Sequence, residues 1–375
     1  MHRDLPISLL PPAPPAPAER AAQALAGLPP GQADASALKA LVELATRYDG
    51  SAGGTAGRFG WLSAVCAQDV VLGKLFESHL DAWAILRELL GTGGATALAA
   101  QVGATDGLWG VWAAGGPGRL RVQPASDVPF IATGRKSWCS GASGVAAALV
   151  TAEELQPDGA TTTRLFAVPL GHPGVTVTSE GWAAIGMQGT GSVDVEFHGV
   201  PAWPVGAAGD YLTRPGFWHG AAGIAACWHG AARAIAAPLR DRVRREQDKA
   251  QDTGAEADGL LAAHLGAVDG ALSASAALLR EAAGAIDRHR AGGRAFGRRE
   301  ALAVRAAAEA AAQAVMEHTG RALGAGPLCR DARHAARVAD LGVFLRQSHA
   351  EWDLAALGRL VATQDTTEKD DPWML

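Results

Sequence analysis

Apolar residues recur every three to four positions in the N-terminal part of the chain. This spacing predicts helices over residues 36–48 and 61–91, with a glycine-rich break at 49–60. We therefore expect an N-terminal helical domain over residues 21–105. The preceding residues 1–20 are rich in Pro and Ala, a composition that favours extended polyproline structure and predicts a flexible arm.

Between residues 106 and 205 the period changes to two. In residues 192–197, SVDVEF, Val193, Val195 and Phe197 face one side while the two acidic residues face the other, which is the pattern of a half-buried strand. Similar signals occur at 146–152, 164–170 and 174–179, separated by Gly and Pro. This stretch predicts a small β domain, a barrel or sandwich, over residues 106–205.

The helical period then returns and continues almost to the end of the chain. It predicts helices over 217–247, 260–290, 301–320 and 331–361, with Gly320 ending the third. Long helices that pack side by side favour an antiparallel bundle, here over residues 206–362. Residues 363–375 are expected to be a frayed tail.

Composition and charge narrow the classes of function. The formal net charge is −5, from 38 acidic and 33 basic residues, and no basic face is concentrated enough to suggest a nucleic-acid partner. The N-terminus lacks the apolar core of a signal peptide, and no stretch has the roughly 18 uninterrupted apolar residues of a membrane span. The four cysteines are widely spaced, which indicates free thiols and no metal site. We expect a cytoplasmic protein.

Three segments resemble motifs of the acyl-CoA dehydrogenase superfamily, whose domain order is also helical, β, helical. TGRKSWCSGAS (133–143) resembles the family's G-x-K-x-W-I-T-x-G. GMQGTGSVDVEFHGVPAWPVG (186–206) is similar to the stretch that ends the family's β domain, and GPLCRDARHAARVAD (326–340) is similar to its R-D-A segment. The resemblance implies a mostly α protein with a central β domain, which binds FAD and assembles as a homodimer or homotetramer.

The first motif implies that Trp138 packs beside the flavin and that the Ser140 hydroxyl lies near flavin N5. An isoalloxazine ring needs a flat apolar neighbour and hydrogen-bond donors. Residues two apart on a strand share one face, so we expect both side chains on the same side. A core Trp beside a satisfied Ser is the alternative. In the loop 108–120, which keeps the family's glycines but lacks its Thr, Glu and Asp, backbone groups of Val111, Trp112 and Ala113 are expected at the pyrimidine edge.

The third motif implies a catalytic carboxylate. A dehydrogenase of this family removes the α-proton of an acyl thioester while hydride leaves the β-carbon, so one acid must face the flavin. Asp340 is the candidate, although a surface acid would give the same pattern, and Glu351 or Asp353 could serve instead. The expected reaction is α,β-dehydrogenation of a thioester of CoA or a carrier protein, with a separate electron acceptor.

Two alternatives remain open. The family's Y-E-G-T segment is absent, which favours a flavin-dependent monooxygenase of the same fold, in which reduced flavin reacts with oxygen and no thioester base is needed. The altered flavin loop and a shortened adenine-side loop at 318–326 favour a degenerate, non-catalytic member.

Overall fold

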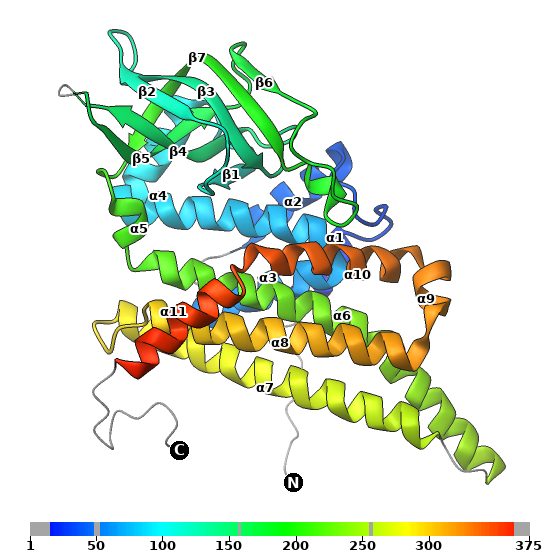
Figure 1. Cartoon of the computed structure of the whole chain (residues 1–375). Coiled ribbons are helices and arrows are strands. Elements are labelled where there is room, and N and C mark those ends of the chain that lie inside the picture. Colours follow the sequence, from blue (N-terminus) through cyan, green and yellow to red (C-terminus); the bar gives the residue numbers. More distant parts are fainter. Residues whose placement is uncertain (1–15, 49–52, 157–158, 255–257, 364–375) are drawn as a thin grey trace, which may run out of the picture.

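The computed structural model describes residues 16–48, 53–156, 159–254 and 258–363. The chain forms a helical N-terminal part, a β domain and a C-terminal helical bundle, in that order (Figure 1). The β domain lies at one end of the molecule, α4 runs along its underside, and the bundle packs beneath α4. The fold class expected from the sequence is therefore confirmed.

The N-terminal part contains α1 (Pro17–Ala24), α2 (Ala35–Arg47), α3 (Gly54–Gln68) and α4 (Val70–Val102). The expectations for residues 1–15 lie outside the described residues, but α1 begins inside the arm that was expected to be extended. A proline in the first helical turn costs little, because the backbone N–H it lacks would have no partner there.

Two further expectations for this part were wrong. The glycine-rich break does not reach residue 60, because α3 already begins at Gly54. The helix expected over 61–91 is split at Asp69, whose extended backbone ends α3 and whose carboxylate accepts a hydrogen bond from the Leu72 nitrogen at 2.9 Å, as an N-cap of α4.

The β domain contains β1 (Trp109–Trp112), β2 (Leu120–Pro124), β3 (Phe130–Cys139), β4 (Ala147–Leu155), β5 (Thr161–Pro169), β6 (Val175–Val177) and β7 (Val193–Val205). Strand pairing closes a ring, from β4 through β2, β3, β7 and β5 back to β4. Strand β1 extends the sheet beside β4, and β6 pairs with β7. The domain is thus a small barrel, and its strands lie within the expected range.

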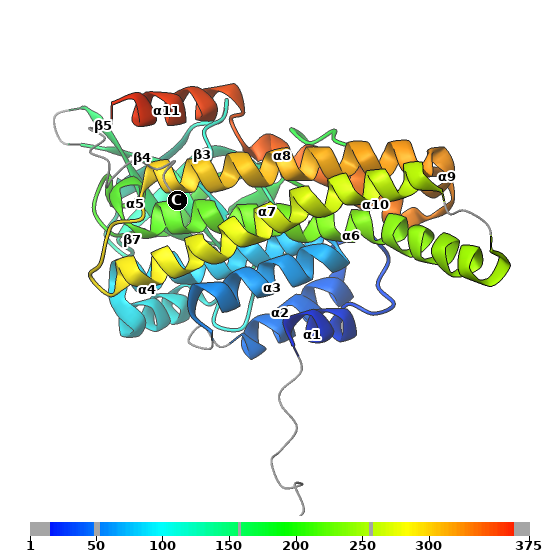
Figure 2. The same ribbon diagram turned by 90° about the horizontal axis from the view of Figure 1, so that it is seen from below.

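The C-terminal part contains α5 (Asp210–Thr213), α6 (Gly216–Thr253), α7 (Gly259–Arg290), α8 (Arg298–Leu323), α9 (Ala325–Arg330), α10 (Ala332–Phe344) and α11 (Glu351–Ala362), with short 3-10 helices at Gln188–Thr190 and Leu345–Gln347. Helices α6, α7 and α8 lie side by side (Figure 2). Among the described helices, α7 alone is long and apolar enough for a membrane span by length and composition, and it packs on α6 and α8.

Two helix ends differ from the prediction. Helix α8 continues past Gly320 to Leu323, since one glycine inside a helix costs only about 1 kcal/mol. The helix expected over 331–361 is interrupted between Phe344 and Glu351, where Ala350 has a φ of 45°. The tail expected at 363–375 lies, beyond Thr363, outside the described residues.

Candidate functional site

Trp138 has an unusual backbone conformation. Its φ is 63°, a left-handed conformation that costs about 1–2 kcal/mol for a residue with a Cβ. The pairing of β3 with β7 shifts register between Lys136 and Cys139, so the backbone bulges at this point. The indole is 47% exposed, and it packs edge-to-face on Trp182 with 6.2 Å between ring centroids. The bulge presents a large aromatic face at the surface.

Ser140 follows the end of β3 and lies in a turn. The expectation that Trp138 and Ser140 share one face of a strand was therefore wrong, because the bulge and the turn remove the strand alternation. The Ser140 hydroxyl lies 2.7 Å from that of Ser192, which lies 2.9 Å from the Thr190 hydroxyl. The Gly141 nitrogen donates to the Thr190 carbonyl at 2.6 Å. These hydroxyls tie the turn to the segment before β7.

Asp340 lies in α10 and is only 5% exposed. Its carboxylate accepts a hydrogen bond from the Met187 nitrogen at 2.5 Å. The Met187 carbonyl in turn accepts hydrogen bonds from the Thr190 hydroxyl at 2.8 Å and the Trp182 indole at 3.2 Å. Burial raises the pKa of Asp340 to about 6, against the effect of the Met187 hydrogen bond. Asp340 thus holds the backbone of Met187, which in turn holds the Trp182 indole.

The other two acids considered from the sequence lie in the first turn of α11. The Asp353 carboxylate accepts a hydrogen bond from the His349 nitrogen at 3.2 Å, across the break between α10 and α11. Glu351 is exposed. The Asp353 carboxylate thus holds the backbone just before α11, while the Glu351 side chain faces solvent.

The loop expected at the flavin's pyrimidine edge is already hydrogen-bonded within the protein. The Val111 nitrogen donates to the Ser78 hydroxyl at 2.9 Å, and the Ala113 carbonyl accepts from the Thr151 hydroxyl at 3.3 Å. Trp112 is buried, and its indole nitrogen donates to the Ser140 carbonyl at 3.0 Å. Trp112 therefore links β1 to the turn after Trp138.

The glycines of this loop allow it to lie directly on β3. A Cβ on Gly116 would lie 2.8 Å from the Ser137 Cβ and 3.3 Å from Cδ1 of Trp138, and a Cβ on Gly118 would lie 2.7 Å from the Arg135 carbonyl. The Ser137 hydroxyl beneath is buried without a hydrogen-bond partner among the described residues. The loop thus packs against the residues that lead into the bulge.

Lys136 fixes the same loop through a second set of hydrogen bonds. Its buried ammonium donates to the Ala114 carbonyl at 3.0 Å and to the Thr151 carbonyl and hydroxyl at 3.2 and 2.8 Å. Burial lowers the pKa of this ammonium group. A cavity of about 390 Å³ lies beside it, lined by the glycine loop, β4, β5 and α5.

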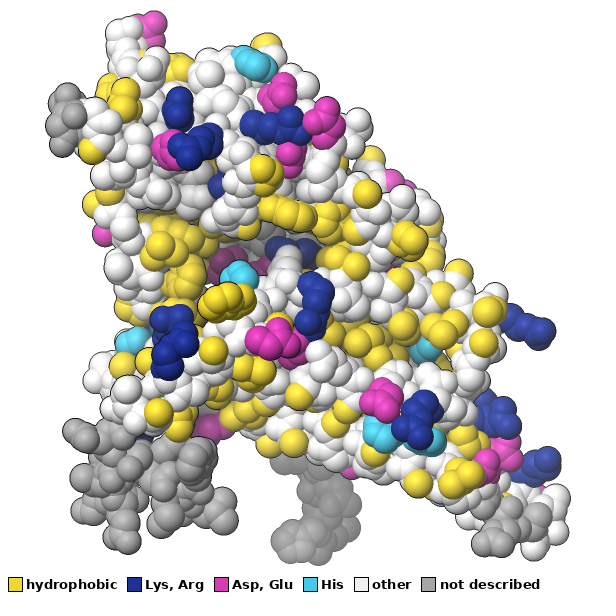
Figure 3. Space-filling view, in the orientation of Figure 1, with side chains coloured by type: hydrophobic (Ala, Val, Ile, Leu, Met, Phe, Trp, Pro, Cys, Tyr) yellow, Lys and Arg dark blue, Asp and Glu magenta, His cyan; other side chains and the backbone are white. Residues whose placement is uncertain are grey.

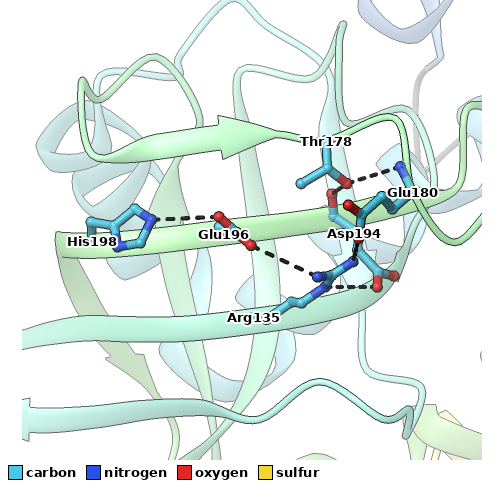
Figure 4. A network of polar contacts seen from close by, with 6 residues as sticks. All are labelled: Arg135, Thr178, Glu180, Asp194, Glu196 and His198. Carbon is cyan, nitrogen blue, oxygen red and sulfur yellow. Dashed lines mark hydrogen bonds and ion pairs between the residues drawn. The ribbon is translucent and has the colours of Figure 1, made fainter.

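Arg135, next to Lys136, points to the outer face of the sheet (Figure 4). Its guanidinium contacts Glu180 at 2.5 Å, Asp194 at 2.8 Å and Glu196 at 3.7 Å. Solvent screens the Arg135 side of these ion pairs, so they contribute little to the free energy of unfolding. Their structural effect is to hold the segment that leads to Trp182 against β7.

Sequence reasoning selected Trp138 and Ser140 as candidates but did not select the residues that hold them, namely Trp182, Met187, Thr190 and Ser192. The segment 186–206 was recognised for its motif, and the two hydroxyl residues in its GTGS sequence were the available signal. No group of three or more metal-ligating side chains lies close together among the described residues.

The surface is hollowed between the β domain and the helices, and hydrophobic side chains gather around the hollow (Figure 3). Inside the protein, α4 carries the buried ion pair of Lys74 and Glu77, 2.9 Å apart. A concave surface with apolar walls and few polar groups is the usual form of a small-molecule site.

No family model and no curated protein matches the chain. Among solved structures, it is similar to butyryl-CoA dehydrogenase from Megasphaera elsdenii, with a TM-score of 0.72, 13% identity and coverage of 92% of this chain and 97% of that one. The chain has the acyl-CoA dehydrogenase fold.

Two monooxygenases share this acyl-CoA dehydrogenase fold with the chain. FMN-bound TdsC from Paenibacillus sp. A11-2, a dibenzothiophene monooxygenase, gives a TM-score of 0.76 at 18% identity, over 92% of this chain and 95% of that one. Methanesulfinate monooxygenase MsuC from Pseudomonas fluorescens gives 0.72 at 21% identity, over 94% and 97%. The fold alone therefore leaves the reaction open.

Proposed function

We propose that the chain is a flavin-dependent monooxygenase that holds the isoalloxazine ring beside Trp138. The observation that carries the proposal is the hydrogen bond between Asp340 and the Met187 nitrogen. This hydrogen bond engages the carboxylate that was predicted as the thioester base, and through it the carboxylate supports the β domain. Oxygen chemistry on reduced flavin needs no such base, whereas α-proton removal does.

The residues beside Trp138 fit a flavin ring. A half-exposed indole, held edge-to-face by Trp182, offers a flat apolar surface, and the Ser140 hydroxyl is oriented by Ser192. Gly116 lies against the edge of the indole without a side chain. The buried Ser137 hydroxyl next to it is without a partner in the described part of the chain. These groups supply the apolar contact and the donors that the ring requires.

When bound, reduced flavin supplies the activation of dioxygen. The chain's own residues then have three tasks. Trp138 and Trp182 exclude water from one side of the site. The Ser140 hydroxyl offers a hydrogen bond to the ring from a fixed position, because the Ser192 hydroxyl holds it in place. Asp340 keeps Met187, and with it Trp182, in position.

The proposed cofactor class is flavin, and its identity is a further question. FAD is what the resemblance to acyl-CoA dehydrogenases implies, whereas TdsC was solved with FMN. Substitution of Trp138 should weaken the binding of either flavin. Substitutions in the adenine-side segment 318–326 should weaken only FAD.

The reaction is tested with the protein and reduced flavin in a stopped-flow instrument. On mixing with oxygenated buffer, the proposal expects oxygen consumption faster than for the same reduced flavin free in solution. Equal rates with and without the protein would remove the monooxygenase proposal.

The second candidate is α,β-dehydrogenation of an acyl thioester of CoA or of a carrier protein, with Asp340 as base and a separate electron acceptor. The pKa of Asp340, raised by burial to about 6, favours it, because a base works best when its pKa is near the working pH. Anaerobic titration with butyryl-CoA tests this candidate: bleaching of bound flavin that is lost in Asp340→Asn would support it. Unbleached flavin would exclude it for that substrate.

If neither flavin binds, the degenerate, non-catalytic member becomes the better description.

Assembly into a homodimer or homotetramer is also proposed, because one side of α7 leaves many apolar residues uncovered in the single chain. Sedimentation velocity tests this, and a monomer at micromolar concentration would contradict it.

A further inference from the structure

A second cavity has a volume of about 520 Å³, and its lining does not include Trp138. Its lining comes mainly from the start of α3, the middle of α4, the start of α6 and the end of α7. Its size lies in the range of about 300–1,000 Å³ that is typical of small-molecule pockets. Helix α4 contacts β1 through Ser78 and His79, and it lines this cavity with later residues from Asp81 to Glu88.

The lining of the cavity carries excess positive charge. Four arginines and two acidic residues line it, which gives a formal charge of +2 with histidine neutral. Asp81 is paired with one arginine, Arg58, at 3.5 Å, and Glu88 with another, Arg214, at 2.7 Å. Arg87 has no carboxylate within ion-pair distance in the described part of the chain, and its guanidinium lies 5.4 Å from the Trp83 ring centroid.

The fourth arginine, Arg290, is only weakly neutralised. Its nearest carboxylate is that of Asp287 at 3.9 Å, and it donates a hydrogen bond to the Thr55 hydroxyl at 3.1 Å. The Thr55 hydroxyl in turn donates to Asp287 at 2.6 Å. The surplus charge of the cavity is therefore carried by Arg87 and Arg290.

Two deeply buried side chains of the lining have incomplete hydrogen bonding. Arg214 is 6% exposed and His219 is 7% exposed. The Nε atom of Arg214 and the Nδ1 atom of His219 have no partner among the described residues. His219 contacts His289 through its other ring nitrogen, at 3.1 Å. Native proteins leave few buried polar atoms unpaired, so these two atoms beside one cavity favour a polar ligand there.

The remaining wall is apolar and aromatic, with Tyr48, Phe59, Ala84 and Pro215. We propose that this cavity is a second ligand site, which binds a small organic anion through a carboxylate or phosphate group carried on an apolar body. Guanidinium groups bind both kinds of anion through paired N–H donors, and the aromatic wall covers the apolar body. The site is separate from the proposed flavin site and does not depend on it.

Isothermal titration calorimetry tests the proposal with three probes of similar shape: benzoate, phenyl phosphate and the neutral benzyl alcohol. At least one anion should bind, and the alcohol should not. Binding of benzoate alone assigns a carboxylate ligand, and binding of phenyl phosphate alone assigns a phosphate. If neither anion binds, or if the alcohol binds equally well, the proposal is overturned.

Three charge-removing variants locate the binding. Arg87→Gln and Arg290→Gln should each weaken anion binding about tenfold or more, as expected for the loss of a hydrogen bond to a charged group. Arg240→Gln removes the same charge from an exposed position of α6 outside the cavity and should bind like the unmodified chain. Equal weakening in all three variants would mean that binding depends only on the net charge of the protein, and it would overturn the proposed site. Melting curves identify any variant that does not fold, and the other cavity variant then carries the test.

Discussion

The carboxylate of Asp340 accepts a hydrogen bond from the backbone nitrogen of Met187, 153 residues earlier in the chain. This contact joins α10 to the segment that supports Trp182, and Trp182 in turn supports Trp138. The geometry of the exposed indole therefore depends on a helix at the far end of the sequence.

Removal of this acceptor should destabilise the protein. In Asp340→Ala the buried Met187 nitrogen would lose its partner, at a cost of about 1–3 kcal/mol in the free energy of unfolding. Asp340→Asn keeps an acceptor oxygen and should cost less. Urea-induced unfolding of the three proteins measures the difference. Equal stability of Asp340→Ala and the unmodified chain would show that the contact does not support the fold.

The stability of the protein should also depend on His79. Its Nδ1 atom accepts a hydrogen bond from the Trp109 nitrogen at 3.0 Å, and burial, with the charge of Arg87, lowers the pKa of His79 to about 4. Between pH 6.5 and about 4 the unfolded chain binds a proton at this site that the folded chain does not. The contribution of His79 to the free energy of unfolding should therefore decrease as the pH is lowered through this window.

The variant His79→Gln isolates this contribution. Its free energy of unfolding should decrease less steeply from pH 6.5 to pH 4 than that of the unmodified chain, because the titrating group has been removed. Denaturant unfolding at a series of pH values gives both slopes. Parallel curves would mean that His79 does not titrate between the folded and unfolded states.

Two adjacent glycines provide a matched test of the loop that covers the bulge. A Cβ on Gly116 would meet Ser137 and Trp138, whereas a Cβ on Gly115 would have no neighbour within 4 Å. Gly116→Ala should displace the loop and weaken flavin binding about tenfold, or about 1.4 kcal/mol. Gly115→Ala should leave it unchanged. If both variants bind flavin alike, the close approach of the loop is unimportant for the site.

The order of the domains could be predicted because it depends on local periodicity. The alternation in SVDVEF is visible in the sequence and predicts the first part of β7, which continues to Val205. The break at Asp69 could also have been predicted, since an N-cap residue directly precedes the apolar start of α4. The positive φ of Ala350 has no comparable local signal, because alanine is not a residue that favours this conformation.

The geometry of the site was harder to predict from the sequence, because contacts between residues far apart in the chain determine it. Trp138 was selected by its motif, but its bulge arises from the pairing of β3 with β7, which lies more than fifty residues away. Asp340 was selected as an acid in a suitable helix, and nothing near it in the sequence reveals its bond to Met187. Motifs therefore selected the candidate residues, while the residues that support them could be seen only in the structure.

The central claim is that flavin binds against Trp138, and an absorbance titration of the purified protein with FMN and with FAD tests it most directly. We expect saturable, stoichiometric binding of at least one of them, with a perturbed flavin spectrum. In Trp138→Leu, binding should be weaker by about tenfold, because the aromatic contact is lost. A flavin spectrum that does not change with excess protein, or identical binding by Trp138→Leu, would contradict the claim.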